Sequence, residues 1–252
     1  MDCLNITKQY YTEWLGLETN FFDKKGIFTT YTSRRDGKQI GYEQPFHLFA
    51  LCSGETTIIS YGTYMQQRID QVEAIFYRES NLERVKIALN NLLGSYPGHA
   101  FKYYFESLPD GLNSSTAKQL TRDDYADYLL FRQQLYPNSD QEIWLQDFFN
   151  GCADQGFIFG IYSNEHLTCA TETPDVPYMN DLVVEIGINT LPEYQRRGQA
   201  KAVCGALIKY LIENRKTPIW SCSYDNIASQ KLADSLGYRK IADVITLTLP
   251  RG

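Results

Sequence analysis

The hydrophobic positions in the first part of the chain follow the pattern of short β-strands. β-branched and aromatic residues are concentrated in three segments, and Asp36-Gly37 and Ser53-Gly54 provide turn signals between them. The three segments span residues 26–32, 47–51 and 57–61. Apolar residues then change to helical spacing over residues 82–92, after Asn81 as a candidate N-cap and before Gly94. These patterns predict a small α+β unit, and no catalytic motif lies within it.

A loop at residues 108–115 separates this unit from a second series of elements. Its Pro, Asp, Gly, Asn and Ser residues make it the most linker-like segment of the sequence. We therefore predict two domains of the α+β class, residues 1–110 and residues 111–252. The second is expected to contain a strand, two helices beginning at Thr121 and Asp140, a hairpin, a long strand, a helix, a strand, a helix and closing strands. These elements are predicted at residues 117–120, 121–135, 140–149, 157–171, 182–190, 200–211, 218–223, 226–236 and 238–249.

Composition narrows the class of protein. The chain has 252 residues, of which 43% are hydrophobic and 21% charged, as in ordinary globular proteins. Its net charge of -6 argues against a nucleic-acid partner, because proteins that neutralise many phosphates usually carry a basic surplus. No segment approaches the ~20 apolar residues of a membrane span. We therefore expect a cytoplasmic protein with neither a nucleic-acid nor a membrane partner.

The cysteines predict no metal site. There are six of them, with no C-x-x-C pair, and the three histidines form no cluster beside them. We expect buried thiols in a reducing compartment. The six are Cys3, Cys52, Cys152, Cys169, Cys204 and Cys222.

A candidate anion-binding loop follows the long predicted strand at residues 182–190. Unpaired backbone N–H groups at the start of the next helix attract an anion, and the small residues Gly198 and Ala200 let a pyrophosphate approach the main chain. Arg196, Arg197 and Lys201 add positive charge. With one glycine and no Gly-Lys-Ser/Thr, the loop matches neither G-x-G-x-x-G nor a Walker A sequence, which argues against nucleotide hydrolysis. The alternative interpretation is an ordinary helix start with solvated arginines.

Two motifs resemble the GNAT acetyltransferase superfamily. Gln195-Arg196-Arg197-Gly198-Gln199-Ala200 matches its Q/R-x-x-G-x-G/A signature, after an approach similar to residues 190–194. Asn226, followed by Ser229, Leu232 and Leu236-Gly237-Tyr238, is similar to the family's asparagine-containing helix that ends in Leu-Gly-Phe/Tyr. The resemblance covers roughly residues 115–250. It implies a GNAT-like mixed sheet flanked by helices and splayed between its fourth and fifth strands, with a separate N-terminal α+β domain as in a bacterial subgroup.

The resemblance implies that the protein binds acetyl-CoA and that it uses no metal. The pantetheine arm would pair with the backbone of the long strand, the pyrophosphate would lie on the loop at residues 195–200, and an asparagine would contact the cofactor from the last helix. The residues expected at the cofactor are Ile188, Asn189, Thr190, Gln195, Arg196, Arg197, Gly198, Gln199, Ala200, Lys201 and Asn226.

The implied reaction is transfer of an acetyl group to a primary amine by direct attack, with a backbone N–H near Ile188 polarising the thioester carbonyl. Glu185 is the candidate base, because alternation places it on one strand face with Gly187 and Asn189. A carboxylate among Val and Ile residues is partly desolvated, which favours proton uptake. The alternative is a solvated or ion-paired carboxylate.

The sequence departs from the family at one catalytic position. The tyrosine that often lies seven residues beyond the asparagine is replaced by Ala233. Tyr224 and Tyr238 are the nearest hydroxyls along the sequence and are the candidate acids, with packing as the alternative role for both. Otherwise the thiolate leaves without a protein acid.

The expected partner is a small-molecule or peptide amine, bound around residues 125–144 and against the N-terminal domain. The acidic chain favours a cationic amine, and a homodimer is compatible with the sequence. The competing hypothesis is a catalytically weak CoA-binding sensor or protein-interaction module. A third interpretation, a protein that binds no nucleotide, requires both motifs to be coincidental.

Overall fold

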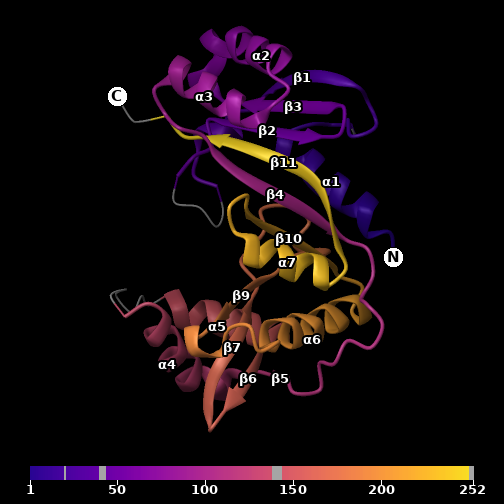
Figure 1. The fold of residues 1–252 in the computed structure, drawn as a ribbon, viewed down its shortest axis with the longest axis vertical. Coiled ribbons are helices and arrows are strands. Elements are labelled where there is room, and N and C mark those ends of the chain that lie inside the picture. The colour runs from indigo at the N-terminus through magenta and orange to yellow at the C-terminus, as the bar shows by residue number, and fades with distance from the viewer. Residues whose placement is uncertain (20, 40–43, 138–143, 250–252) are drawn as a thin grey trace.

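The computed structural model describes residues 1–19, 21–39, 44–137 and 144–249 as a mixed α/β fold (Figure 1). Its α-helices are α1 (Cys3–Leu15), α2 (Ile69–Arg78), α3 (Leu82–Leu93), α4 (Tyr125–Leu135), α5 (Trp144–Asp154), α6 (Gln199–Glu213) and α7 (Ile227–Ser235). Its strands are β1 (Gly26–Tyr31), β2 (Leu48–Ser53), β3 (Thr56–Tyr61), β4 (Gly98–Phe105), β5 (Lys118–Gln119), β6 (Phe159–Ser163), β7 (His166–Glu172), β8 (Val183–Glu185), β9 (Gly187–Thr190), β10 (Thr217–Ser223) and β11 (Tyr238–Leu247).

The strands form two sheets. A seven-stranded mixed sheet has the order β1-β3-β2-β11-β4-β10-β8, and a four-stranded antiparallel sheet has the order β5-β6-β7-β9. Figure 1 shows β11 and β4 side by side, linking the N-terminal strands to the part of the molecule that carries α6 and α7. The predicted mixed sheet flanked by helices is confirmed.

Strand β4 lies between β10 and β11 and is antiparallel to both. β4 belongs to the N-terminal half of the sequence, whereas both of its partners belong to the C-terminal half. Strands from both sides of the expected boundary after residue 110 thus share one sheet. The division into residues 1–110 and 111–252 stays a prediction.

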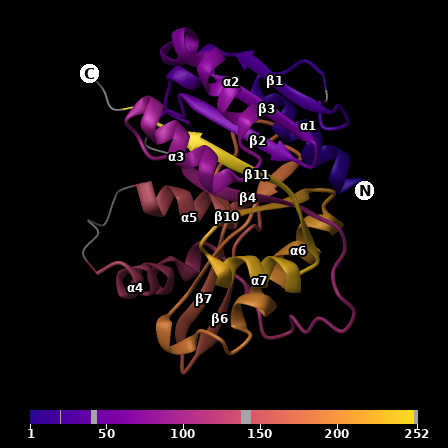
Figure 2. The same ribbon diagram turned by 45° about the horizontal axis from the view of Figure 1, so that its top comes forward.

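Helices cover both faces of the seven-stranded sheet. On one face, Tyr11 and Trp14 of α1 pack against Phe49 and Ile219. On the other face, α2 and α3 cover β2, β3 and β11, while α6 and α7 cover β4 and β10. The helices α4 and α5 pack on the four-stranded sheet, and Figure 2 shows them on the opposite side of the molecule from α6 and α7.

The structure contains two helices that the sequence patterns did not predict, α1 and α2. Many of the residues in α1 are aromatic or β-branched, types that are weak helix formers, and burial of Tyr10, Tyr11 and Leu15 overrides this propensity. The predicted cap of α3 is confirmed, since Asn81 Oδ1 accepts hydrogen bonds from the backbone N–H groups of Glu83 at 2.8 Å and Arg84 at 3.3 Å. The predicted helix start at Asp140 lies outside the described residues.

Candidate functional site

The long predicted strand is divided between the two sheets at Ile186. Its first part, β8, pairs in parallel with β10, and its second part, β9, pairs antiparallel with β7. The Ile186 N–H donates to Ile219 O at 3.1 Å, and the Leu191 N–H donates to Thr168 O at 2.9 Å. Beyond Ile186 the two sheets separate, so β9 forms the edge of the four-stranded sheet among the described strands.

This division leaves backbone donors on the open edge of β9. Because N–H groups alternate in direction along an extended strand, those of Ile188 and Thr190 point away from β7, towards the side where β10 has diverged. An extended chain carrying amide groups can pair with such an edge. This is the edge at which the pantetheine arm was expected.

The loop after β9 leads into a helix whose N-terminus has no side-chain cap. Arg196 has φ +59° and Gly198 has φ +81°, and no side chain caps the first turn of α6. A Cβ added to Gly198 would have no protein atom within 4 Å, so the space beside this backbone is open. The exposed N–H groups and the positive end of the helix dipole can attract an anion, and residues 195–201 are called the cradle below.

Positive side chains surround this cradle. Arg196 and Arg197 are exposed and Lys201 is half-buried, and none of the three forms an ion pair within the described part of the chain. The Arg197 guanidinium lies 5.2 Å from the centre of the Tyr194 ring. Gln195 Nε2 donates to Thr190 O at 3.3 Å, on the open edge of β9. The predicted strand and loop residues are therefore brought together.

The side chain of Gln199 has a different role. Its Oε1 accepts a hydrogen bond from Thr168 Oγ1 at 3.1 Å, and its Nε2 donates to Ser163 Oγ at 3.3 Å. These contacts attach the start of α6 to the β6–β7 hairpin. Only the backbone of Gln199, and not its side chain, faces the cradle in this arrangement.

The second motif lies at the same end of the sheet as the cradle. Because β8 and β10 are parallel, the loops that follow β9 and β10 leave in the same direction. Asn226 caps α7, with its Oδ1 accepting from the Ser229 N–H at 3.0 Å. Its amide nitrogen is the group that remains to donate to a ligand.

Glu185 ends β8 and is half-buried. Its Oε1 accepts a hydrogen bond from the Ser221 hydroxyl, so its partner is neutral rather than a cation. Beside it is a cavity of about 20 Å³, which has room for a single water molecule. The residues around this cavity are Tyr10, Tyr11, Trp14, Lys102, Asp175, Pro177 and Glu185.

The two candidate acids, Tyr224 and Tyr238, lie in different environments. Tyr238 is fully buried, and its ring centre lies 5.6 Å from that of Trp220. Burial raises the pKa of its hydroxyl well above the ordinary value, and that hydroxyl has no hydrogen-bond partner among the described residues. Tyr224 stacks on His99 with ring centres 4.7 Å apart, and Lys86 Nζ lies 4.2 Å from its ring centre. Burial argues against the predicted catalytic role of Tyr238, and the role of Tyr224 stays a prediction.

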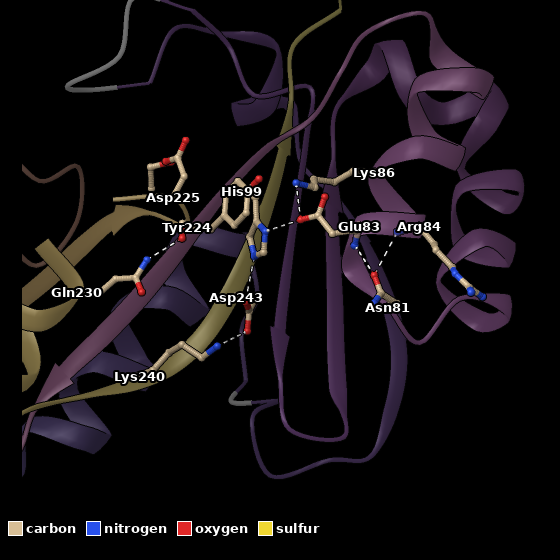
Figure 3. A network of polar contacts seen from close by, with 11 residues as sticks. Asn81, Glu83, Arg84, Lys86, His99, Tyr224, Asp225, Gln230, Lys240 and Asp243 are labelled. Atoms are coloured by element: carbon tan, nitrogen blue, oxygen red, sulfur yellow. Dashed lines mark hydrogen bonds and ion pairs between the residues drawn. The ribbon is translucent and has the colours of Figure 1, made fainter. Parts of the chain in front are cut away.

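A polar network fixes the loop between β10 and α7 (Figure 3). The Tyr224 N–H donates to His99 O at 3.1 Å, and His99 Nε2 is 2.9 Å from Asp243 Oδ1. Lys86 Nζ is 2.8 Å from Glu83 Oε1. The network thus holds Tyr224, two residues before Asn226, against α3 and β4. The sequence carries no local signal for this network, because His99 and Asp243 lie 144 residues apart along the chain.

A larger pocket lies next to the divided strand. It has a volume of about 290 Å³ and is lined by Tyr128, Arg132, Trp144, Leu145, Phe148, Glu172, Pro174 and Asp175. Glu172 pairs in register with Gly187, so the pocket adjoins the break between β8 and β9. The Tyr128 hydroxyl and Arg132 Nη1 both donate to Glu172 Oε1, at 2.9 and 2.8 Å. The pocket lies in the region expected for an acceptor.

The described residues offer no group of three or more His, Cys, Asp or Glu side chains that could hold a metal ion. The six cysteines are free thiols, and burial raises the pKa of Cys52 to about 11 and that of Cys169 to about 12. No helix within the described ranges is long and apolar enough to cross a membrane.

Comparison with known proteins gives one family match. A family model described as GNAT acetyltransferase matches residues 57–246. The match begins well before residue 115, where the resemblance was expected to start, and therefore includes β3 and β4. A curated relative, the uncharacterised N-acetyltransferase YdfB of Bacillus subtilis, is 28% identical over 149 residues, or 59% of this chain and 52% of that protein. The chain thus spans about half the length of this relative.

Solved structures share the fold. An acetyltransferase from the GNAT family of Colwellia psychrerythraea superposes with a TM-score of 0.54 at 17% identity, over 65% of this chain and 61% of that one. A GCN5-related N-acetyltransferase of Sphaerobacter thermophilus gives 0.51 at 12% identity, over 67% and 57%.

Proposed function

The chain belongs to the GNAT acetyltransferase family, and from this we propose that it transfers the acetyl group of acetyl-CoA to a primary amine by direct attack. The observation that carries the proposal is the open edge of β9 next to the uncapped start of α6. A strand edge suits the amide groups of a pantetheine arm, and the cradle at Gly198 suits a pyrophosphate.

The chain's own residues divide the work of binding. Backbone groups of Ile188 and Thr190 would hold the pantetheine arm, while the first turn of α6 with Arg196, Arg197 and Lys201 would hold the phosphates. The amide nitrogen of Asn226, at the start of α7, would donate a hydrogen bond to the cofactor from the β10 side of the gap between β9 and β10. Acetyl-CoA supplies the activated acetyl group as a thioester.

The remaining residues suit proton removal and charge stabilisation. Glu185 would accept a proton from the ammonium group, and the neutral nitrogen would then attack the carbonyl carbon. The Ile188 N–H would donate to the oxygen as its charge increases, a contribution of about 3 to 4 kcal/mol in comparable sites. As the new C–N bond forms, the C–S bond breaks, and the sulfur takes the electron pair and the second amine proton. The products are an amide and free CoA.

The geometry favours departure of the thiolate without a protein acid. Ala233 is fully buried, Tyr238 lies in the core, and the Tyr224 ring is stacked on His99. Holding the two reactants in the reactive orientation can supply roughly 7 to 11 kcal/mol, which reduces the need for an acid. The amine acceptor would bind in the pocket of about 290 Å³ that adjoins Gly187 through Glu172.

Calorimetric titration with acetyl-CoA tests the cradle. We expect micromolar binding, near -8 kcal/mol, by the unmodified protein. Gly198→Asn keeps a residue that tolerates positive φ but fills the open space, so it should weaken binding at least tenfold. Gly54→Asn is the matched control, because Gly54 also has positive φ and open space but lies in the β2–β3 turn. Equal binding by both variants would show that the loop is not the cradle.

A second candidate function is a catalytically weak CoA-binding sensor or protein-interaction module. It is favoured by Ala233 and by the burial of Tyr238, because neither residue can then protonate the thiolate of CoA as it departs. Thiol release in the presence of an amine panel distinguishes the two. Steady release with any amine supports the enzyme, and an intact thioester in a protein that binds acetyl-CoA supports the sensor.

A further inference from the structure

The pocket beside the divided strand has an excess of negative charge. Arg132 is paired with Glu172 at 2.8 Å, and its guanidinium also lies 4.4 Å from the Tyr136 ring centre. Asp175 forms no ion pair within the described part of the chain. Once Arg132 and Glu172 neutralise each other, the charge that remains in the pocket is the Asp175 carboxylate.

The rest of the pocket wall is apolar and aromatic. Trp144 and Phe148 lie on successive turns of α5 with ring centres 5.9 Å apart in an edge-to-face arrangement, and Leu145 and Pro174 complete the wall. Trp144 is 49% exposed, so its ring is accessible from this pocket. The volume of about 290 Å³ is near the small end of the range for ligand pockets.

Asp175 lines this pocket and also the small cavity that contains Glu185. It is therefore the residue at which the acceptor pocket and the candidate base adjoin. Asp175 is exposed, and an ammonium group held at it would lie on the side of the pocket that adjoins the cavity of Glu185. The apolar part of the same molecule would extend along Trp144 and Phe148, whose ring faces also attract a cation.

We propose that the acceptor is a small amine with one positive charge, an aromatic or aliphatic body and no carboxylate or phosphate, and that Asp175 selects it. The inference rests on the proposed acetyltransferase function and names its substrate class. A carboxylate beside the amine would be repelled by Asp175, and Arg132 is already paired with Glu172. A second ammonium would lie against the apolar wall and lose its hydration without a partner.

Three probe amines separate these features. Phenethylamine has the proposed form, phenylalanine adds a carboxylate to the same body, and spermidine replaces the body with further charges. With each, kcat/KM is measured by thiol release at saturating acetyl-CoA, and acetyl-CoA affinity is measured in parallel. We expect phenethylamine to exceed both others at least tenfold.

Asp175→Asn tests the selecting residue. It should raise KM for phenethylamine about five- to tenfold, leave kcat within about twofold and leave acetyl-CoA affinity unchanged. It should also reduce the discrimination against phenylalanine. Asp181→Asn is the matched control, because Asp181 is an exposed carboxylate of the same β7–β8 connection and does not line the pocket.

The outcomes separate this inference from the function on which it rests. Faster acetylation of phenylalanine or spermidine would overturn the substrate class while leaving the acetyltransferase in place. Equal KM values for the Asp175 and Asp181 variants would remove Asp175 as the selecting residue. Acetyl-CoA binding with no thiol release from any amine would overturn the proposed function and this inference together.

Discussion

Glu185 is the proposed base, and a substitution at this residue tests that role. It is half-buried, hydrogen-bonded to Ser221 and next to a cavity that can hold one water. Glu185→Gln keeps a similar shape and the acceptor oxygen for Ser221 but removes the basic group. We expect kcat to fall about 100-fold or more, with acetyl-CoA affinity within about twofold. Steady-state kinetics and calorimetry measure the two quantities.

The control for this substitution is Glu193→Gln, because Glu193 is an exposed carboxylate in the loop after β9. It should leave kcat nearly unchanged. An unchanged kcat in Glu185→Gln would remove Glu185 from the mechanism.

Asp243 links stability to pH. Burial alone would raise its pKa, but hydrogen bonds from His99 and Lys240 outweigh this effect and hold the pKa below its ordinary value. A carboxyl whose pKa is lower in the folded state stabilises the protein above its unfolded pKa of about 3.9 and loses this contribution as pH falls through the folded value. Glu83 and Lys86 also face this cluster from α3.

Asp243→Asn should therefore lower stability at pH 7 and reduce the further loss of stability as the pH falls below about 5. Urea unfolding at several pH values measures this difference. Asp23→Asn is the control, because the Asp23 side chain, which pairs with Lys8, is 71% exposed and solvent weakens the contribution of such a pair. Parallel pH profiles for the unmodified protein and the Asp243 variant would contradict the assignment.

Single-residue roles were predictable where the cause is local. The cap at Asn81 and the open cradle at Gly198 follow from neighbouring residues and their backbone preferences. The burial of Tyr238 and its contact with Trp220 depend on how distant segments pack, so the sequence alone did not reveal them. For the same reason, His99 looked isolated in the sequence although its ring lies against Asp243 and Tyr224.

At the level of elements, the division of the strand at residues 182–190 also depends on distant segments and was not predictable from the sequence alone. Residues 182–190 have a continuous strand pattern, and the sequence accordingly predicted one strand. The structure divides it at Ile186, because β8 pairs with β10 while β9 pairs with β7. The presence and direction of the strand were predictable, but its change of partner is decided by tertiary contacts.

Strand β4 makes the C-terminal half dependent on the N-terminal half. Tyr103 and Phe105 of β4 are buried in the same cluster as Trp220 and Tyr238. A fragment of residues 111–252 would lack this strand and leave the facing edges of β10 and β11 unpaired. We expect such a fragment to show no cooperative thermal unfolding by circular dichroism and no acetyl-CoA binding.

Adding residues 1–110 as a separate chain should restore part of the fold, because it supplies β4. A fragment 111–252 that unfolds cooperatively and binds acetyl-CoA by itself would contradict this dependence. That result would also support the predicted domain boundary.

At the scale of the whole molecule, the proposed cofactor site lies where the two sheets separate. Acetyl-CoA would bind only when both sheets are folded, so binding should stabilise them together. At 100 times Kd the stabilisation is about 2.7 kcal/mol. For a chain of this size, that corresponds to a rise in Tm of about 5 to 10 °C. Differential scanning fluorimetry measures it.

Gly198→Asn should show a much smaller rise at the same acetyl-CoA concentration, because its cradle is filled. A rise in Tm for Gly198→Asn equal to that of the unmodified protein would contradict the placement of the ligand at this cradle.

The position of β11 also determines when this protein can finish folding during synthesis. β11 lies between β2 and β4, pairing Leu247 with Leu48 and Tyr238 with Phe105. A nascent chain on the ribosome therefore carries β1–β4 without the strand that joins them until residues 238–247 have been synthesised. During that time β2 and β4 lack the strand that lies between them, and their exposed apolar residues favour aggregation. Closure of the larger sheet thus has to wait for the synthesis of β11.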